Sequence, residues 1–353
     1  MIKTLTGKID FAESLRGQSA TFILSMSNTK TANIEGITQA GIPGMLHLTP
    51  TLDAEFLCTG EVRSLENIAI TPKGVPTPAL ITRAVHLLHP FRTIELLNLG
   101  LEIFPKVNYF TIHDMELSPS DSVQTGANID ALAVFQKGLE FGQSYTPKSD
   151  YVILGESVPS GTTTALATAL ALGYACEDKF SSSFKNSPKN IKKEVVESAL
   201  KNISPNDDLF AILSKVSDNM LIFNAGFILG ANDKAYSILL AGGTQMACVL
   251  LVVNRILEMM EGEIDATKVS LCTTKWVAQD PHSDIQGLLE MLNFSINSYY
   301  TDFDFSLTEH PALKLYDEGE AKEGVGAGGA LMYGLLNGVT KKEISRKVES
   351  FLG

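Results

Sequence analysis

Cysteine and tryptophan are scarce in this chain, which has four cysteines and one tryptophan among 353 residues. The cysteines stand far apart, in or beside apolar runs, and no C-x-x-C pair occurs: Cys58, Cys176, Cys248 and Cys272. This spacing argues against a disulfide framework and against a thiolate zinc site. We expect reduced, structural thiols in a cytoplasmic protein.

Positive charge is also in deficit. Lysine and arginine total 28 against 40 aspartates and glutamates, a formal net charge of −12. This balance argues against a general nucleic-acid or anionic-membrane surface, although one small phosphate pocket remains compatible with it. A content of 44% hydrophobic and 19% charged residues is typical of a globular chain with a sizeable core.

Long hydrophobic runs are missing as well. The most apolar segment, Met246 to Met260, is interrupted by Asn254 and Arg255, so no stretch reaches membrane-spanning length. The stretch from Met1 to Phe11 has no apolar region of the kind that a signal peptide needs. We therefore expect a soluble intracellular protein with no membrane partner.

Several catalytic motifs are absent. A phosphate-binding P-loop needs G-x-x-x-x-G-K-[ST], but Gly155 and Gly161 have five residues between them and no lysine follows. No G-x-S-x-G turn and no H-E-x-x-H are present. The pair His86 and His89 has helical spacing, but we interpret it as solvated or capping, and we expect no metal site.

The most informative stretch of the chain runs from Tyr151 to Tyr174. Four apolar residues, Tyr151 to Leu154, form an uninterrupted run typical of a strand buried on both faces of a parallel sheet. A turn from Gly155 to Gly161 follows, and then an Ala/Leu-rich helix begins near Thr162. The free N–H groups and dipole of such a helix N-terminus favour a phosphate or carboxylate, although helix capping alone also accounts for these residue types.

This design recurs twice. An apolar run ending at Leu240 leads into Gly242 and Gly243 before a long apolar helix, and a third cluster, Glu323 to Gly329, opens the apolar segment Ala330 to Leu336. Because the carboxyl ends of parallel strands meet at one edge of a sheet, three such turns predict one shared crevice. The two carboxylates embedded in these turns, Glu156 and Glu323, favour acid–base chemistry on a phosphorylated small molecule.

Strands are predicted to alternate with helices, which indicates a parallel α/β sheet. The predicted strands are Ala20 to Met26, Glu55 to Val62, Thr93 to Leu99, Tyr151 to Leu154, Ala235 to Leu240, Lys268 to Thr273 and Phe294 to Tyr299. The predicted helices include Phe11 to Arg16, Ala79 to Leu88, Ile129 to Phe141, Ile191 to Lys201, Asp207 to Val216 and Lys341 to Leu352. The stretch from Gly100 to Gly126 is predicted to be a long polar loop.

These motifs together resemble the nicotinate-nucleotide:dimethylbenzimidazole phosphoribosyltransferases of cobamide biosynthesis. In that family a strand leads to a Gly-Glu turn and then Thr-Thr, as in Gly155-Glu156 and Thr162-Thr163. A later Glu-Gly-x-Gly-Ala turn matches Glu323 to Ala327. The resemblance covers roughly residues 93 to 340, and the chain looks most like a divergent branch of archaeal, cyanobacterial and other bacterial proteins.

The resemblance implies a doubly wound, mostly parallel, Rossmann-like α/β fold with a small helical domain built from the two chain ends. It places residues 18–300 in the α/β domain, and residues 1–17 plus 301–353 in the small domain that carries the Glu323 turn. It also implies a homodimer, for which the apolar segments Met220 to Gly230 and Met246 to Met260 are candidate interfaces, although plain core burial explains these segments equally well.

The implied reaction moves 5-phosphoribosyl from nicotinate mononucleotide to a benzimidazole-like base, without a cofactor. We predict that Glu323 is the catalytic base and that Glu156 orients the acceptor or polarises the site. The structural alternative is that Glu323 only caps a helix. The catalytic alternative is that the two glutamates exchange these roles. The predicted phosphate- and nucleotide-binding residues are Ser157, Val158, Ser160, Gly161, Thr162, Lys192, Gly242, Gly243, Gly324 and Gly326. The alternatives are the same donor with adenine or a phenol as acceptor, and a non-catalytic nucleotide-sensing protein.

Overall fold

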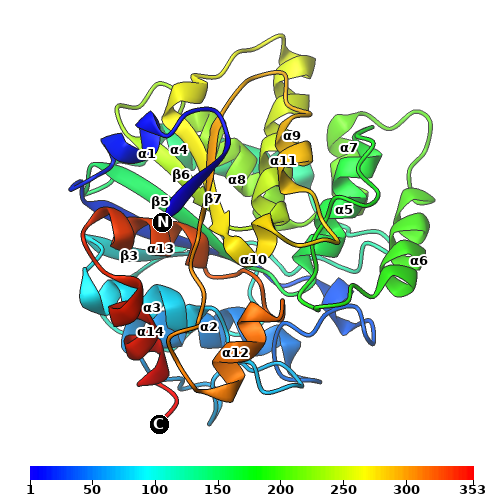
Figure 1. The fold of residues 1–353 in the computed structure, drawn as a ribbon. Coiled ribbons are helices and arrows are strands. Elements are labelled where there is room, and N and C mark those ends of the chain that lie inside the picture. The colour runs from blue at the N-terminus through cyan, green and yellow to red at the C-terminus, as the bar shows by residue number, and fades with distance from the viewer.

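The computed structural model describes all 353 residues and contains one eight-stranded sheet (Figure 1). Its strands are β1 (Ile2–Thr6), β2 (Ala20–Met26), β3 (Thr93–Asn98), β4 (Thr111–Asp114), β5 (Tyr151–Ser157), β6 (Ser237–Ala241), β7 (Val269–Thr274) and β8 (Asn297–Thr301). Across the sheet the order is β1-β8-β7-β6-β5-β2-β3-β4. All neighbours run parallel except β1, which is antiparallel to β8. The predicted mostly parallel α/β fold is thereby confirmed.

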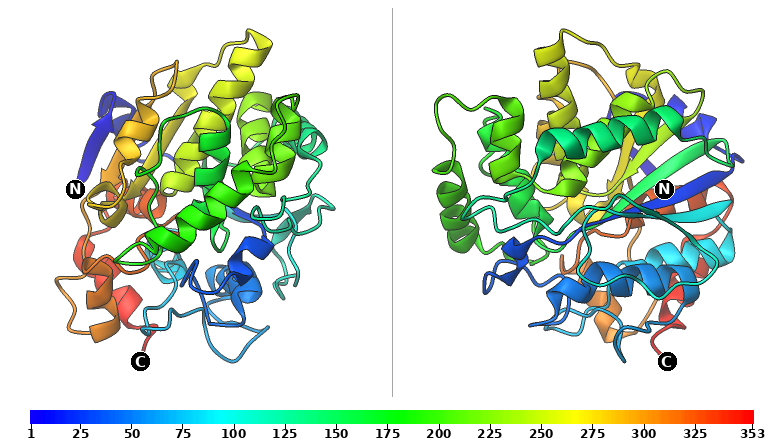
Figure 2. Two further views of the ribbon diagram at one scale, coloured as in Figure 1. Left: turned by 90° about the vertical axis from the view of Figure 1, so that its right-hand side faces the viewer. Right: turned by 180° about the vertical axis from the view of Figure 1, so that it is seen from behind.

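Fourteen α-helices connect or flank the strands. They are α1 (Asp10–Ser14), α2 (Thr49–Thr59), α3 (Ala79–Leu88), α4 (Ala131–Ser144), α5 (Gly161–Ala171), α6 (Lys189–Leu200), α7 (Leu209–Val216), α8 (Asn219–Gly230), α9 (Thr244–Met260), α10 (Lys275–Ala278), α11 (Ile285–Leu289), α12 (Pro311–Asp317), α13 (Ala327–Leu336) and α14 (Lys341–Glu349). The turned views show α2 and α3, in blue and cyan, on the opposite side of the sheet from the green and yellow helices (Figure 2).

Each face of the sheet has its own hydrophobic core. Along β5, Val152 and Leu154 pack with helices α4, α5, α8 and α9, whereas Tyr151 and Ile153 pack with α2, α3, α13 and α14. Because successive strand side chains point to opposite faces, an uninterrupted apolar run is what a strand buried between two helical layers requires. No helix of the structure is both long enough and apolar enough to cross a membrane.

Two sequence predictions fail near the beginning of the chain. Glu55 to Val62 was predicted as a strand, but α2 covers Thr49–Thr59, with Pro50 in its first turn and Gly60 closing it at a φ of 80°. Proline suits the first turn of a helix and a left-handed glycine suits the residue after its end, so both ends are locally encoded.

The second failure concerns Ile2–Thr6, which was placed with the helical domain but forms the edge strand β1. Backbone pairing with β8 holds this stretch in the sheet, and an interaction across almost the whole chain leaves no local signal. The edge strand β4 was likewise missed inside the predicted loop. The division into two domains remains a prediction.

The two segments offered as dimer interfaces lie inside the protomer. In α8, ten of the eleven residues from Met220 to Gly230 are buried, and α9 is buried from Met246 to Asn254. Core packing against α4 and α5 therefore explains most of their hydrophobicity, as the core-burial alternative predicted, and among their apolar residues only Met259 and Met260 at the end of α9 are largely exposed. The homodimer itself stays a prediction.

Candidate active site

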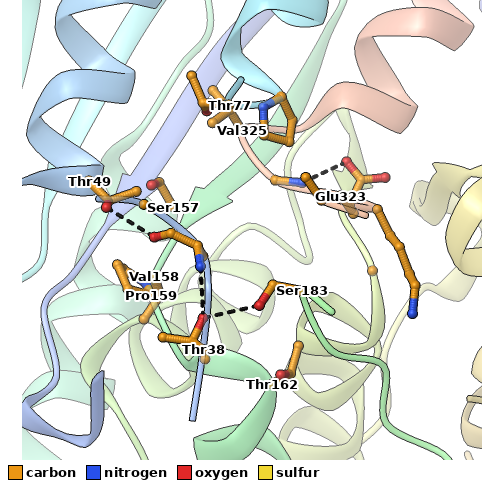
Figure 3. Close-up of a pocket in the computed structure, with 18 of the residues that line it drawn as sticks. Thr38, Thr49, Thr77, Ser157, Val158, Pro159, Thr162, Ser183, Glu323 and Val325 are labelled. Atoms are coloured by element: carbon orange, nitrogen blue, oxygen red, sulfur yellow. Dashed lines mark hydrogen bonds between the residues drawn. The ribbon is translucent and has the colours of Figure 1, made fainter. Parts of the chain in front are cut away.

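The turns singled out in the sequence meet at one cavity beside the carboxyl ends of β5, β6 and β7 (Figure 3). Of the predicted site residues, nine line it: Glu156, Ser157, Val158, Ser160, Gly161, Thr162, Gly243, Glu323 and Gly324. Gly242, Gly326 and Lys192 do not, although Gly242 approaches the Glu156 side chain and Gly326 packs against Gly155. Three turns that are far apart in the sequence thus share one site, as expected of an open parallel sheet.

Helix α5 begins at this cavity with free backbone donors. The turn at its start places Ser160 in the left-handed region at a φ of 62°. The N–H of Gly161 bonds the Val158 carbonyl, but no hydrogen bond satisfies the N–H groups of Ser160 and Thr162. Free N–H groups at a helix N-terminus form a ready site for a phosphate or carboxylate.

Two buried polar atoms beside this turn lack partners. Neither the hydroxyl oxygen of Ser160 nor the amide oxygen of Gln245 accepts or donates a hydrogen bond, and both residues line the cavity. Buried polar atoms in native proteins are nearly always paired, so a ligand or water in the cavity is the expected partner. A Cβ on Gly161 would lie 1.9 Å from the Gln245 oxygen, so a larger residue at position 161 would require the Gln245 side chain to shift.

Glu323 is held on both carboxylate oxygens. Its Oε1 accepts hydrogen bonds from the N–H groups of Gly324 at 3.2 Å and Gly328 at 3.1 Å. Its Oε2 accepts from the Thr274 N–H at 2.9 Å and the Thr273 hydroxyl at 3.3 Å. Desolvation nevertheless raises the pKa of Glu323 to about 7, against the opposing effect of these donors. A carboxyl that titrates near neutrality suits a general base.

Glu156 lies at the end of β5, buried with 3% of its surface exposed. Desolvation, followed by the charge of Glu323, raises its pKa to about 8, and the Val158 N–H opposes this rise. At pH 7 Glu156 therefore carries its proton for most of the time. The site pairs a neutral carboxyl, which can donate a hydrogen bond, with a carboxyl that can accept a proton.

Lys192 sits one layer behind the cavity wall. Its ammonium group donates to the carbonyl of Ser181 at 2.8 Å, and Ser181 lines the cavity together with Ser182 and Ser183. Burial, and then the nearby Lys322, lower the pKa of Lys192 to about 7. Lys192 thus supports the serine loop rather than facing the cavity directly.

Lys322 and Asp280 form a buried ion pair beside that loop. The Lys322 ammonium group lies 2.7 Å from the Asp280 carboxylate, which also accepts the Ser181 hydroxyl at 2.8 Å. Because Asp280 neutralises only one of the two lysines, this side of the site carries a surplus of positive charge when Lys192, whose pKa is about 7, is protonated. Lys322 stands directly before Glu323, so the same ion pair anchors the Glu323 turn.

Four loops are tied together beside the cavity. The buried carboxylate of Glu320 accepts hydrogen bonds from Lys73, Gln39 and the Lys185 N–H, which belong to three different loops. Gln39 also donates to the Ser183 carbonyl at 2.6 Å. The cavity has a volume of about 110 Å³, which is smaller than the roughly 300–1,000 Å³ of typical ligand pockets.

Some cavity residues were not predicted from the sequence. Asp53, Thr77, Ser181 and Gln245 line the same space. Asp53 was missed because its helix was predicted as the strand Glu55 to Val62, and the serines because they lie in a polar loop without a motif. Pro50 and Gly60 are the local signals that would have placed Asp53 on a helix.

Comparisons with known proteins give close relatives in sequence. A UPF0284 protein of Sulfurisphaera tokodaii is 37% identical over 352 residues, covering 99% of this chain and 96% of the relative. A UPF0284 protein of Saccharolobus islandicus is 35% identical over 360 residues, covering 100% and 97%. One from Saccharolobus solfataricus is 36% identical over 335 residues, covering 93% and 91%. No protein-family model matches the chain.

Solved structures give distant relatives in fold. The nicotinate-nucleotide-dimethylbenzimidazole phosphoribosyltransferase of Thermus thermophilus superposes with a TM-score of 0.61 at 15% identity, covering 95% of this chain and 83% of that one. A second structure, of CobT from the same organism, gives a TM-score of 0.61 at 14% identity, covering 94% and 84%. At these identities the likeness shows the fold, and it confirms the resemblance found in the sequence at that level. The chain belongs to the UPF0284 family, and its fold is that of the nicotinate-nucleotide-dimethylbenzimidazole phosphoribosyltransferases.

Proposed function

We propose that this protein transfers the 5-phosphoribosyl group of nicotinate mononucleotide to a benzimidazole-like base, giving an α-riboside 5′-phosphate and nicotinate for the lower ligand of a cobamide. The observation that carries the proposal is that one cavity combines a free helix N-terminus with a desolvated carboxyl that titrates near neutrality. Thr162 and Glu323 lie on opposite sides of that cavity (Figure 3). This arrangement matches a nucleotide, which is anionic at its phosphate end and reacts at its base end.

The phosphate is placed at the start of α5. The free N–H groups of Ser160 and Thr162 and the unpartnered hydroxyl of Ser160 supply three donors, and the helix dipole favours an anion there. The Ser181 to Ser183 loop, backed by Lys192, adds hydroxyls and positive potential from the other side.

The base end is placed at Glu323. In the reaction a ring nitrogen of the acceptor forms a bond to the anomeric carbon of the ribosyl group. The bond from that carbon to the pyridine nitrogen of nicotinate breaks, and its electron pair neutralises the positive ring nitrogen. The acceptor becomes cationic as it reacts, so its other N–H loses a proton, which the Glu323 carboxylate accepts. Glu156, neutral at pH 7, donates a hydrogen bond that orients the acceptor or polarises the site.

The glycine-rich turn after Glu323 suits this role. Gly324 has a φ of 147° and Gly326 a φ of 67°, a backbone path that side-chain-bearing residues rarely follow. Gly324 lines the cavity and has no side chain to obstruct a planar base, whereas Gly326 packs against Phe22 and Gly155. Val325 also has a positive φ of 52°, and such strain is a common feature of functional turns.

Incubation of the protein with nicotinate mononucleotide and a panel of acceptors, followed by chromatography, tests the proposal. Benzimidazoles, adenine and a phenol form the panel. We expect a riboside phosphate and an equal amount of nicotinate with a benzimidazole. If product forms only with adenine or only with the phenol, that compound replaces the benzimidazole as the proposed acceptor. Tight donor binding without any product would favour the nucleotide-sensing alternative.

A further inference from the structure

Asp53 differs from three other buried acidic side chains of this protein, Glu55, Asp280 and Asp218. Glu55 accepts three backbone N–H groups, Asp280 pairs with Lys322, and Asp218 accepts the Leu221 N–H. The partners of these three carboxylates are the protein's own backbone N–H groups or a lysine, as expected of structural carboxylates. Asp53 is 3% exposed and has neither a cation nor a backbone N–H as a partner.

Two hydroxyls are the hydrogen-bond partners of Asp53. Thr77 donates its hydroxyl to Oδ1 at 2.6 Å, and Ser157 donates its hydroxyl to Oδ2 at 2.7 Å. All three side chains line the cavity. A carboxylate offers about four acceptor positions, so two remain for a ligand, and the Ser157 oxygen can itself accept a hydrogen bond. Asp53 and Ser157 thus present acceptors side by side.

The position of this pair matches the middle of a nucleotide. Ser157 follows Glu156 directly and precedes the turn with the free N–H groups of Ser160 and Thr162. Ser157 lies beside Val158 and Pro159 of that turn and on the side of the cavity toward Thr77 (Figure 3). A ribose lies in the same way between the phosphate and the base, with its two hydroxyls on one edge.

We propose that Asp53, with Ser157, recognises the vicinal 2′,3′-diol of the ribose and so selects a ribonucleotide as the phosphoribosyl donor. The inference rests on the proposed function, because it assigns the sugar subsite of the same cavity. A buried carboxylate with free acceptor positions is stabilised by ligand O–H donors. Hydrogen bonds to a charged group are stronger than those between neutral groups. A donor that lacks the 2′- and 3′-hydroxyls leaves the Asp53 carboxylate without these hydrogen bonds, and a site of this kind discriminates strongly against such an analogue.

Calorimetric titration of the intact protein with nicotinate mononucleotide and with its 2′,3′-dideoxy analogue tests the assignment. The wild-type protein should bind the ribonucleotide at least about tenfold more tightly, as expected for hydrogen bonds to a charged group. Asp53→Asn should remove most of that preference. Glu55→Gln is the matched control, because Glu55 is buried on the same helix but does not line the cavity, and it should keep the preference.

Equal affinity of the wild-type protein for the two nucleotides would overturn the inference, and so would an unchanged preference in Asp53→Asn. If Asp53→Asn does not fold, as judged by circular dichroism, Ser157→Ala gives the same test, because it removes the second acceptor of the pair. Failure of both nucleotides to bind the wild-type protein would instead overturn the proposed donor, and the sugar assignment would fall with it.

Discussion

Glu156 and Glu323 face the same cavity from two turns, but the protein holds them in different ways. Glu323 accepts four hydrogen bonds, three from backbone N–H groups, whereas the Val158 N–H is the donor that opposes the raised pKa of Glu156. Burial raises the pKa of both carboxyls, to about 7 for Glu323 and about 8 for Glu156. The N–H donors around Glu323, together with the negative charges of Glu323, Asp218 and Asp53 that raise the pKa of Glu156, favour ionisation of Glu323 first.

That difference assigns complementary roles. Once Glu323 is ionised, its negative charge keeps the proton on Glu156. The pair then holds an acceptor and a donor at neutral pH, although both residues are the same amino acid at the edge of the same sheet. Environment, not residue type, separates a base from a hydrogen-bond donor.

The largest expected effect comes from removing the base. Glu323→Gln should lower kcat by about 10²–10⁴, the usual cost of losing a general base, and leave donor binding nearly intact because the proposed phosphate site is at α5. Glu156→Gln should lower kcat less, since the amide still donates a hydrogen bond. Steady-state kinetics check both variants. Near-normal turnover of Glu323→Gln together with an inactive Glu156→Gln would require the two roles to be exchanged.

A second effect is expected at the opposite end of the cavity. Lys192→Ala should raise the KM for the donor about tenfold, because it removes the buried amino group that holds the Ser181 carbonyl from behind the serine loop, and it should change kcat little. The neighbouring Lys193 is exposed and pairs weakly with Glu197, so Lys193→Ala is the matched control and should keep the normal KM. An unchanged KM in both variants would remove Lys192 from the site.

The pH profile of the reaction sharpens the comparison further. The value of kcat/KM should rise as Glu323 ionises near pH 7 and fall above about pH 8 as Glu156 loses its proton. Glu156→Gln should abolish the fall and leave the rise in place. If the alkaline fall persists in this variant, another group titrates there and Glu156 has no role as a proton-bearing donor.

The smallest effect concerns stability. The folded protein keeps the Glu156 proton up to about pH 8, whereas the unfolded chain loses it near its ordinary pKa, so the folded state binds more protons between these values and stability falls as pH rises. From pH 5 to 7 the contribution of Glu156 is a loss of about 2 kcal/mol. Urea unfolding at these two pH values should show a shallower fall for Glu156→Gln, and an identical slope would place the pKa of Glu156 near its ordinary range.

Much of the fold could be predicted from local patterns. The buried strand Tyr151 to Leu154 and the helix Ala79 to Leu88 agree with β5 and α3. Their signals are short-range: apolar period, proline in a first turn and glycine at an end. The strand β1 was missed because its only support is pairing with β8, which is almost the whole chain away.

The sequence by itself determined the three turns at the sheet edge and the two glutamates within them, because strand ends, glycine turns and helix starts are encoded by adjacent residues. Tertiary structure alone decided that Asp53 joins the site, that Lys192 lies behind Ser181, and that Glu323 and Glu156 titrate in that order. The physical reason is that a pKa depends on lost water and on nearby donors and charges. Some of those neighbours come from distant segments, such as Thr273 and Thr274 beside Glu323 and Glu323 beside Glu156, which only the fold brings together.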